Sequence, residues 1–309
     1  MFTIIICTYN GAGRIGRVLD NVLKQDDFQD LVDSVLVIDN ASNDNTSNIV
    51  NSLSQKNNRI RCLTEIKPGL SNARACGVRN CNSEWIIFLD DDNYIEQDWI
   101  KGANSYIANH PDVGAFNGNV IPIFNRELTS DEQVRLDIVY LGLACTSSSE
   151  KLLYHDPKKW LPFGAGLVIR TEPLKKLLNN GWLKSEGRKH NSIISGEDTE
   201  MVLHIVLSGY STGFCNDIIL RHDVGVKRLE MDYLKKLYYS FGVAHYRIIS
   251  SKKLGGLRVV KYGTISKLKI MKMSMFDKIR NLSKQEFYTN ILETCRIQGF
   301  FDAVHKRVL

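Results

Sequence analysis

The chain has 309 residues, of which 43% are hydrophobic and 24% are charged, a composition typical of a globular protein with a sizeable core. No apolar run approaches the ~20 residues that a transmembrane helix needs, so we expect no membrane span. The seven cysteines are scattered, odd in number and without a Cys-x-x-Cys pair. This pattern argues against a zinc or disulfide scaffold and predicts reduced thiols in the cytoplasm.

The formal net charge of +6 is unevenly distributed along the chain. Residues 251–309 hold 13 Lys and Arg against 4 Asp and Glu, a net charge of +9, whereas residues 1–250 have a net charge of −3. In the tail, basic residues are interleaved with apolar ones. Two interpretations stay open: a helical appendage with a solvated basic face, or an amphipathic region that lies on an anionic membrane.

In the first part of the chain, apolar segments alternate with amphipathic ones. Strands are predicted at residues 2–7, 35–38, 60–63 and 84–89, and helices at 15–23, 46–53 and 70–81. This alternation predicts an α/β protein with a mainly parallel, Rossmann-like sheet flanked by helices. The later pattern is less regular, with strands expected at 113–121, 161–170 and 211–219 and a helix at 197–207. After about residue 226 the pattern becomes helical and basic.

Polar residues follow three of the predicted strands at the point where each strand ends. They are Thr8-Tyr9-Asn10, Asp39-Asn40 and Asp90-Asp91-Asp92. Ligands of open parallel sheets bind beyond the carboxyl ends of the strands, so we expect these clusters to form one site. Three adjacent acids repel one another, and a bound Mg²⁺ or Mn²⁺ would relieve that repulsion. The alternative is a solvated turn that caps the next helix.

Five short motifs occur in a characteristic order. They cover residues 4–11, 37–44, 67–74, 88–92 and 196–198. Together they resemble the family-2 nucleotide-sugar glycosyltransferases, in particular those of bacterial surface polysaccharides. The resemblance implies a GT-A fold over residues 1–245, with a nucleotide-binding half at 1–110 and an acceptor half at 111–245. Residues 246–309 then form a basic helical C-terminal region.

The resemblance implies roles for the residues at the first two strand ends. Thr8 and Asn10 line the nucleotide pocket, and Asp39 accepts the imino N–H of the base. The alternative for Asp39 is an ordinary turn residue. Arg74 is expected to contact the base or the diphosphate, although an arginine on a helix is otherwise most often solvated.

The resemblance also implies that the acidic triplet and one histidine bind the metal ion and the ribose. Asp92 is the direct ligand of a divalent cation, Mn²⁺ or Mg²⁺, while Asp90 and Asp91 face the ribose or a metal-bound water. In this interpretation His222 is a further metal ligand. The alternative is an ordinary structural role. Phosphate oxygens and waters would complete the coordination shell.

Glu197 and Asp198 stand at the start of a predicted helix, where acids also favour the macrodipole. The resemblance implies that Asp198 is the general base that deprotonates the acceptor hydroxyl in an inverting reaction. Glu197 is expected to orient the acceptor. Gly164 and Gly166 lie in a loop before a predicted strand and are expected beside the acceptor and donor sugars. The alternative is that they form a plain turn.

The expected partners are a nucleotide-diphospho-sugar, with a UDP-sugar favoured, and a glycan or lipid-linked acceptor. Residues 251–309 are expected to meet an anionic membrane at the inner face of the plasma membrane, and the protein is expected in the cytoplasm without a nucleic-acid partner. Two alternatives are a sugar nucleotidyltransferase and a non-catalytic nucleic-acid-binding protein. Gly11-Ala12-Gly13-Arg14 only weakly resembles the glycine-rich phosphate loop expected of a nucleotidyltransferase. The sequence leaves the oligomeric state open.

Overall fold

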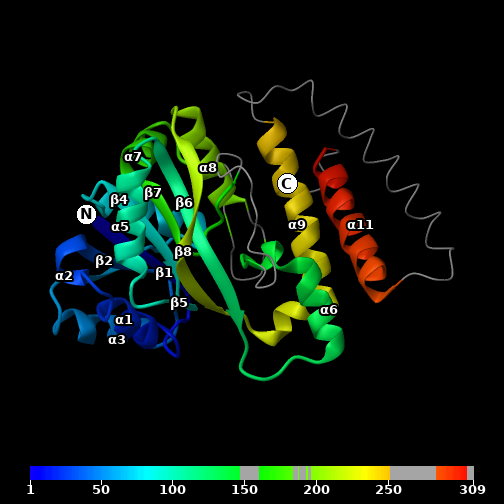
Figure 1. Cartoon of the computed structure of the whole chain (residues 1–309), viewed down its shortest axis with the longest axis horizontal. Helices are drawn as coiled ribbons and strands as arrows, with labels where there is room; N and C mark the ends of the chain where they lie inside the picture. Colours follow the sequence, from blue (N-terminus) through cyan, green and yellow to red (C-terminus); the bar gives the residue numbers. More distant parts are fainter. Residues whose placement is uncertain (147–159, 184–186, 188–192, 194–195, 251–282, 305–309) are drawn as a thin grey trace. The chain divides into compact units, whose positions relative to one another are not determined.

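A computed structural model describes residues 1–146, 160–183, 187, 193, 196–250 and 283–304. These residues form two compact units, coloured by sequence in Figure 1. The first comprises the described residues of Met1–Ile123, Ala144–His190 and Glu197–Val224. The second comprises those of Phe124–Leu143, Asn191–Gly196 and Gly225–Leu309. The predicted boundary after residue 245 falls inside a helix of the second unit, and the division at that point stays a prediction.

The first unit is built on an eight-stranded sheet with the order β3-β2-β1-β4-β7-β6-β8-β5. Its strands are β1 (Phe2–Thr8), β2 (Val32–Asp39), β3 (Ile60–Thr64), β4 (Trp85–Asp90), β5 (Asn93–Ile95), β6 (Val113–Ile123), β7 (Leu167–Arg170) and β8 (Ser211–Asp223). The pairs β3–β2, β2–β1, β1–β4 and β6–β8 are parallel, and the other three are antiparallel. The first four strands thus form the expected parallel half.

Helices cover the sheet of the first unit. They are α1 (Ile15–Leu23), α2 (Phe28–Leu31), α3 (Thr46–Ser54), α4 (Leu70–Asn80), α5 (Trp99–Asn109), α7 (Thr171–Asn179) and α8 (Glu197–Leu207). Successive residues of β1, such as Ile4, Ile5 and Ile6, are all fully buried. Because neighbouring side chains of a strand point to opposite faces, both faces of this strand are covered. The continuous apolar runs in the sequence have this cause.

Two predicted strands end or begin elsewhere. The segment 161–170 was expected to be one strand, but only Leu167–Arg170 pairs as β7. Gly164 and Gly166 lie in the preceding loop, where Gly166 has a φ of 66° that strands do not allow. The strand predicted at 211–219 continues to Asp223, because its last residues pair with β6 on one side and with the short strand β5 on the other. This continuation carries His222.

The second unit is helical over its described residues. It contains α6 (Ser130–Val139), the 3-10 turns η1 (Leu141–Leu143) and η3 (Val226–Leu229), and the long helices α9 (Met231–Ser250) and α11 (Lys284–Val304). The helices α9 and α11 approach closely where each has a glycine. A Cβ on Gly242 would meet the backbone of Arg296, and a Cβ on Gly299 would meet the backbone of Tyr239. Two missing side chains therefore set the distance between these helices.

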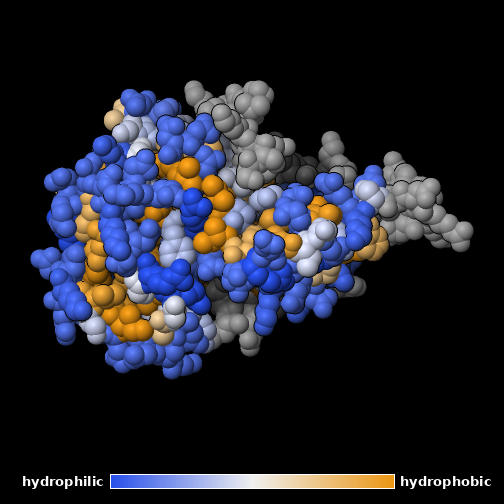
Figure 2. Space-filling view, turned by 60° about the horizontal axis from the view of Figure 1, so that its bottom comes forward, coloured by the Kyte–Doolittle hydropathy of each residue, from blue (hydrophilic) through white to orange (hydrophobic). Residues whose placement is uncertain are grey.

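Most of the basic tail lies in residues 251–282 and 305–309, outside the described residues, so its predicted contact with a membrane stays a prediction. Among the helices of the described residues, none is long and apolar enough to cross a bilayer. On the face shown in Figure 2, hydrophilic side chains cover much of the described surface, and apolar side chains gather in separate patches.

Candidate functional site

The carboxyl ends of β1, β2 and β4 lie side by side at one edge of the sheet. The parallel register pairs Thr8 with Asp39 and Cys7 with Asp90. The three polar clusters found in the sequence therefore meet at one edge. Side-chain hydrogen bonds link them further and give each acid a different environment.

The central acid of the triplet is neutralised by an arginine. Arg14 donates to Asp91 through Nη2 at 2.9 Å and Nε at 3.2 Å, and the Thr8 hydroxyl donates to Asp91 Oδ2 at 2.6 Å. A Cβ on Gly11 would lie 2.6 Å from the same carboxylate oxygen, so the loop after β1 needs a glycine here. Arg14 thus relieves part of the repulsion among the three acids. The sequence analysis did not assign it, since no spacing rule pairs it with Asp91.

Asp39 is buried and holds the turn that follows β2. Its Oδ1 accepts from the Ser42 amide at 3.0 Å, and its Oδ2 accepts from the Ser47 hydroxyl. Asn10 braces the same turn, because its Oδ1 accepts from the Asn43 amide at 2.8 Å. Each carboxylate oxygen has two lone pairs, so Asp39 keeps acceptor capacity for the N–H of a base. The turn role is present, and the base-reading role stays a prediction.

Asn40 was missed as a positioning residue. Its side-chain amide donates to the carbonyl oxygens of Glu65 and Lys67, each at 2.9 Å, and its Oδ1 accepts from the Gly69 amide at 2.8 Å. These three bonds fix the loop between β3 and α4 against the end of β2. Only the adjacency of Asn40 to Asp39 could have pointed to it.

Arg74 on α4 and Glu197 at the start of α8 form a buried ion pair, with Nη1 3.1 Å from Oε1. The Arg74 guanidinium also lies over the Phe88 ring, 5.3 Å from its centroid. Burial lowers the pKa of Arg74. The nearby carboxylates of Glu197, Asp90 and Asp198 together outweigh burial, so the net shift of this pKa is upward. The predicted contacts of Arg74 with the nucleotide and of Glu197 with the acceptor stay predictions beside this observed pairing.

Asp198 is held by the loop that precedes β7. Its Oδ2 accepts from the Gly164 amide at 2.9 Å, and its Oδ1 accepts from the Thr199 amide at 2.7 Å. A Cβ on Gly164 would lie 2.6 Å from an Arg74 side-chain nitrogen and 3.5 Å from the Asp198 carboxylate. The structure therefore brings together two of the predicted site residues, Gly164 and Asp198. Gly166, at positive φ, shapes the same loop.

Asp92 and His222 also meet, with the imidazole Nε2 3.4 Å from Asp92 Oδ1. The pairing of β5 with β8 sets Asn93 opposite His222 and so brings the histidine to the triplet. Asn93 donates to Asp92 Oδ1 at 3.1 Å and accepts from the Asp90 amide at 3.1 Å. Cys145 Sγ lies 3.6 Å from His222 Nδ1, on the other side of the ring.

This pair suits a divalent cation in part. Within the described residues there is no group of three or more His, Cys, Asp or Glu arranged to hold a metal ion. One carboxylate and one imidazole are nevertheless adequate protein ligands where phosphates and waters supply the rest, as is usual for Mg²⁺ and acceptable for Mn²⁺. The residues present fit such an ion. The metal assignment of Asp92 and His222 stays a prediction.

Comparison with known proteins assigns a family to part of the chain. Residues 3–149 match the model of glycosyl transferase family 2. Over 110 residues the chain is 31% identical to the poly(ribitol-phosphate) beta-N-acetylglucosaminyltransferase TarS of Staphylococcus aureus. That alignment covers 35% of the chain and 19% of TarS. The match therefore spans about a fifth of the length of this relative.

Two solved structures share the fold. The mannosyltransferase PcManGT from Pyrobaculum calidifontis, in complex with GDP-Man and Mn²⁺, has a TM-score of 0.64 at 17% identity, covering 99% of this chain and 88% of that one. S. aureus TarS 1-349 in complex with UDP-GlcNAc has a TM-score of 0.55 at 16% identity, covering 96% and 92%. The predicted GT-A fold is confirmed. Residues 3–149, just under half of the chain, match the family that the motifs indicated.

Proposed function

We propose that the protein is an inverting, metal-dependent glycosyltransferase that moves a sugar from a nucleotide-diphospho-sugar to a hydroxyl of a glycan or lipid-linked glycan. The observation that carries this proposal is the convergence of Asp39, the acidic triplet and Thr8 on one sheet edge. The family match of residues 3–149 supports it. A nucleotidyltransferase is less well supported, because Gly11 and Arg14 serve the Asp91 contact.

For the donor, the free lone pairs of Asp39 would accept the ring N–H of uracil, with Asn10 and Thr8 lining the pocket and Asp90 reaching the ribose. Guanine offers a similar N–H, and the two structural neighbours were solved with UDP-GlcNAc and GDP-Man. A UDP-sugar is favoured, because the chain is 31% identical over 110 residues to TarS, and TarS was solved with UDP-GlcNAc.

A Mn²⁺ or Mg²⁺ ion would be held by Asp92 and His222. When bound, such an ion neutralises the negative charge that develops on the departing diphosphate. The chain's own residues prepare the place for it: Asn93 orients Asp92 by donating to Oδ1, and the antiparallel pairing of β5 with β8 holds His222 opposite. Arg14 adds a positive charge next to Asp91.

Asp198 would act as the general base. The acceptor oxygen forms a bond to the anomeric carbon, the bond from that carbon to the diphosphate breaks on the opposite face, and the hydroxyl proton passes to Asp198. The amides of Gly164 and Thr199 hold the carboxylate in one orientation for this transfer. Glu197, fixed by Arg74, would hold the start of α8 beside the acceptor.

For the cellular role, we propose extension of a cell-envelope polysaccharide from the cytoplasm. The names of the matching relatives include TarS, a chondroitin synthase and a hyaluronan synthase, each matched over a minor part of its length. A peripheral position at the inner face of the plasma membrane would involve residues 251–309, which lie mostly outside the described residues.

The test is direct binding to the full chain. Isothermal titration with UDP, GDP and CMP, each with and without Mn²⁺, should show one preferred nucleoside diphosphate whose affinity rises with the metal. The matching nucleotide-sugar should then be consumed in the presence of an extract of lipid-linked glycans. Absence of binding to every nucleotide would overturn the proposal.

A further inference from the structure

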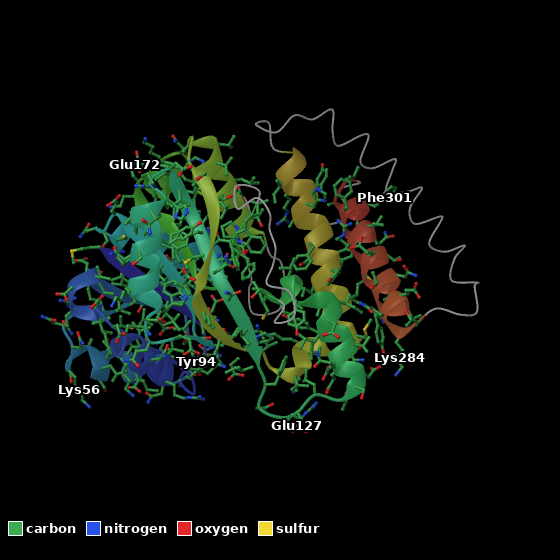
Figure 3. All side chains as sticks on the ribbon, viewed as in Figure 1. Lys56, Tyr94, Glu127, Glu172, Lys284 and Phe301 are labelled. Carbon is green, nitrogen blue, oxygen red and sulfur yellow. The ribbon has the colours of Figure 1, made fainter. Side chains whose placement is uncertain are left out.

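One tyrosine beside the acidic triplet has a buried hydroxyl that the reaction described above does not use. Tyr94 lies in β5, two residues after Asp92. Its hydroxyl oxygen is buried and has no hydrogen-bond partner among the residues that the structure describes. Figure 3 labels Tyr94 in the region of α1 and β5.

An orphan hydroxyl is unusual in a folded protein. A buried Tyr hydroxyl normally finds a partner, because removing it from water without one is unfavourable. Thr8, for comparison, places its hydroxyl on Asp91 at the same end of the sheet. The Tyr94 hydroxyl therefore calls for an acceptor that comes from outside the described residues, either a ligand or a trapped water.

The charges around Tyr94 indicate which ligand. The Arg17 guanidinium lies over the ring, 5.2 Å from its centroid, and Arg17, Asp223, Asp92 and Arg14 act electrostatically on the phenol. Arg14 and Arg17 stand at the start of α1. The Arg17 guanidinium and a neutral O–H donor suit an oxyanion, whereas Arg14 is already paired with Asp91. A diphosphate bound beside Asp92 would bring phosphate oxygens to this part of the site.

We propose that Tyr94 is a further donor-site residue whose hydroxyl donates a hydrogen bond to a diphosphate oxygen of the nucleotide-sugar. This inference rests on the proposed function. It assigns to β5 a binding role in addition to its structural one, which is to pair with β8 opposite His222. Since a phenol is neutral at pH 7, it donates to phosphate without adding charge to the site.

Titration of the full chain tests this proposal with Tyr94→Phe, using the nucleoside diphosphate that the wild type prefers, the corresponding nucleoside, and Mn²⁺ alone. Affinity for the diphosphate should fall roughly 10-fold or more, because a hydrogen bond to a charged group is lost. Affinities for the nucleoside and for Mn²⁺ should stay within twofold of wild type. The melting temperature without ligand should not fall, because no partnered group is removed.

A matched control is Tyr239→Phe on α9, which removes a phenolic hydroxyl that donates to Asp302 at 2.9 Å. It should lower the melting temperature and leave diphosphate affinity unchanged.

Three results for Tyr94→Phe would overturn the inference while the proposed function stands: unchanged diphosphate affinity, a loss that is equal for the nucleoside, or a loss of Mn²⁺ affinity alone. A fall in melting temperature like that of the control would assign the hydroxyl to a trapped water instead. A wild-type chain that binds no nucleotide would overturn both proposals.

Discussion

The guanidinium of Arg74 lies 3.1 Å from the carboxylate of Glu197, although 123 residues separate the two in the sequence. Their side chains are 3% and 6% exposed, so the pair is shielded from solvent. It ties α4, in the predicted nucleotide-binding half, to the start of α8, whose next residue is Asp198. The pair therefore fixes the start of α8 next to Asp198, the proposed general base.

Glu197→Gln should lower the free energy of unfolding by about 3–5 kcal/mol, because it leaves the Arg74 charge buried without its counter-charge. Urea denaturation followed by circular dichroism measures this change. The double change Arg74→Met with Glu197→Leu should recover part of the loss, since no buried charge then remains. Asp20→Asn, which breaks the exposed pair with Lys24, is the control and should cost at most about 1 kcal/mol. A Glu197→Gln loss no larger than the control's would show that the ion pair adds nothing net.

Asp198→Asn should reduce kcat by roughly 10²–10⁴-fold, because the acceptor hydroxyl loses the group that takes its proton. The new amide has one oxygen, so it keeps only one of the two hydrogen bonds that the Gly164 and Thr199 amides donate, at a cost of about 1 kcal/mol of stability. Donor KM should stay close to wild type. Steady-state release of the nucleoside diphosphate measures both constants. Asp30→Asn, an exposed acid on α2, serves as the control. An Asp198→Asn enzyme that retains wild-type kcat would remove Asp198 from the reaction.

Asp92→Asn and His222→Gln should each weaken Mn²⁺ binding by at least about 10-fold, because each changes one of the two proposed protein ligands. Free Mn²⁺ measured by electron paramagnetic resonance gives the affinity in the presence of a nucleoside diphosphate. Asn93→Ala, which frees the Asp92 carboxylate to rotate, should weaken binding by about 10–100-fold. Asp217→Asn, an exposed acid on the same strand as His222, should have no effect. Equal Mn²⁺ affinity in all four variants would place the ion elsewhere.

His245 on α9 should make the second unit less stable in mild acid. Burial, with a smaller contribution from Arg296, lowers the pKa of His245 below 6.5. As the pH falls through 6.5, the unfolded chain binds a proton that the folded chain does not, so the free energy of unfolding decreases until the folded pKa is passed. Denaturation at pH 7.5 and 5.5 should show a smaller decrease for His245→Gln than for wild type. An identical decrease in both would exclude His245 as the cause.

The parallel half of the sheet was predictable from the sequence because its strands are continuous apolar runs that end in Asp, Asn or Thr. Thr8, Asp39 and Asp90 needed only this pattern to be placed at one edge. The short strand β5 was not predictable, because three residues show no periodicity. The continuation of β8 to His222 was missed as well, because it depends on pairing with both β5 and the end of β6.

The supporting residues of the site were missed for a related reason. Arg14, Asn40 and Asn93 act through side-chain hydrogen bonds. Arg14 bonds to Asp91, 77 residues away, Asn40 to Gly69, 29 residues away, and Asn93 to Asp90, 3 residues away. No motif in a single sequence encodes such pairs. Asp91 and Asp90 were chosen because of their residue type and position, whereas their partners Arg14 and Asn93 become visible only once the strands are aligned.

Gly242→Ala and Gly299→Ala should each destabilise the second unit by about 1–3 kcal/mol, because each new methyl group meets backbone of the facing helix instead of a flexible side chain. Backbone cannot move aside without separating α9 from α11. Gly16→Ala is the control: this helical glycine on α1 has its nearest neighbour 4.0 Å from an added Cβ, at Ile49. There the change should raise stability by about 0.5–1 kcal/mol, since alanine favours the helix. Thermal denaturation of the three variants measures the contrast. Stabilisation by all three changes would show that α9 and α11 are not packed through their glycines.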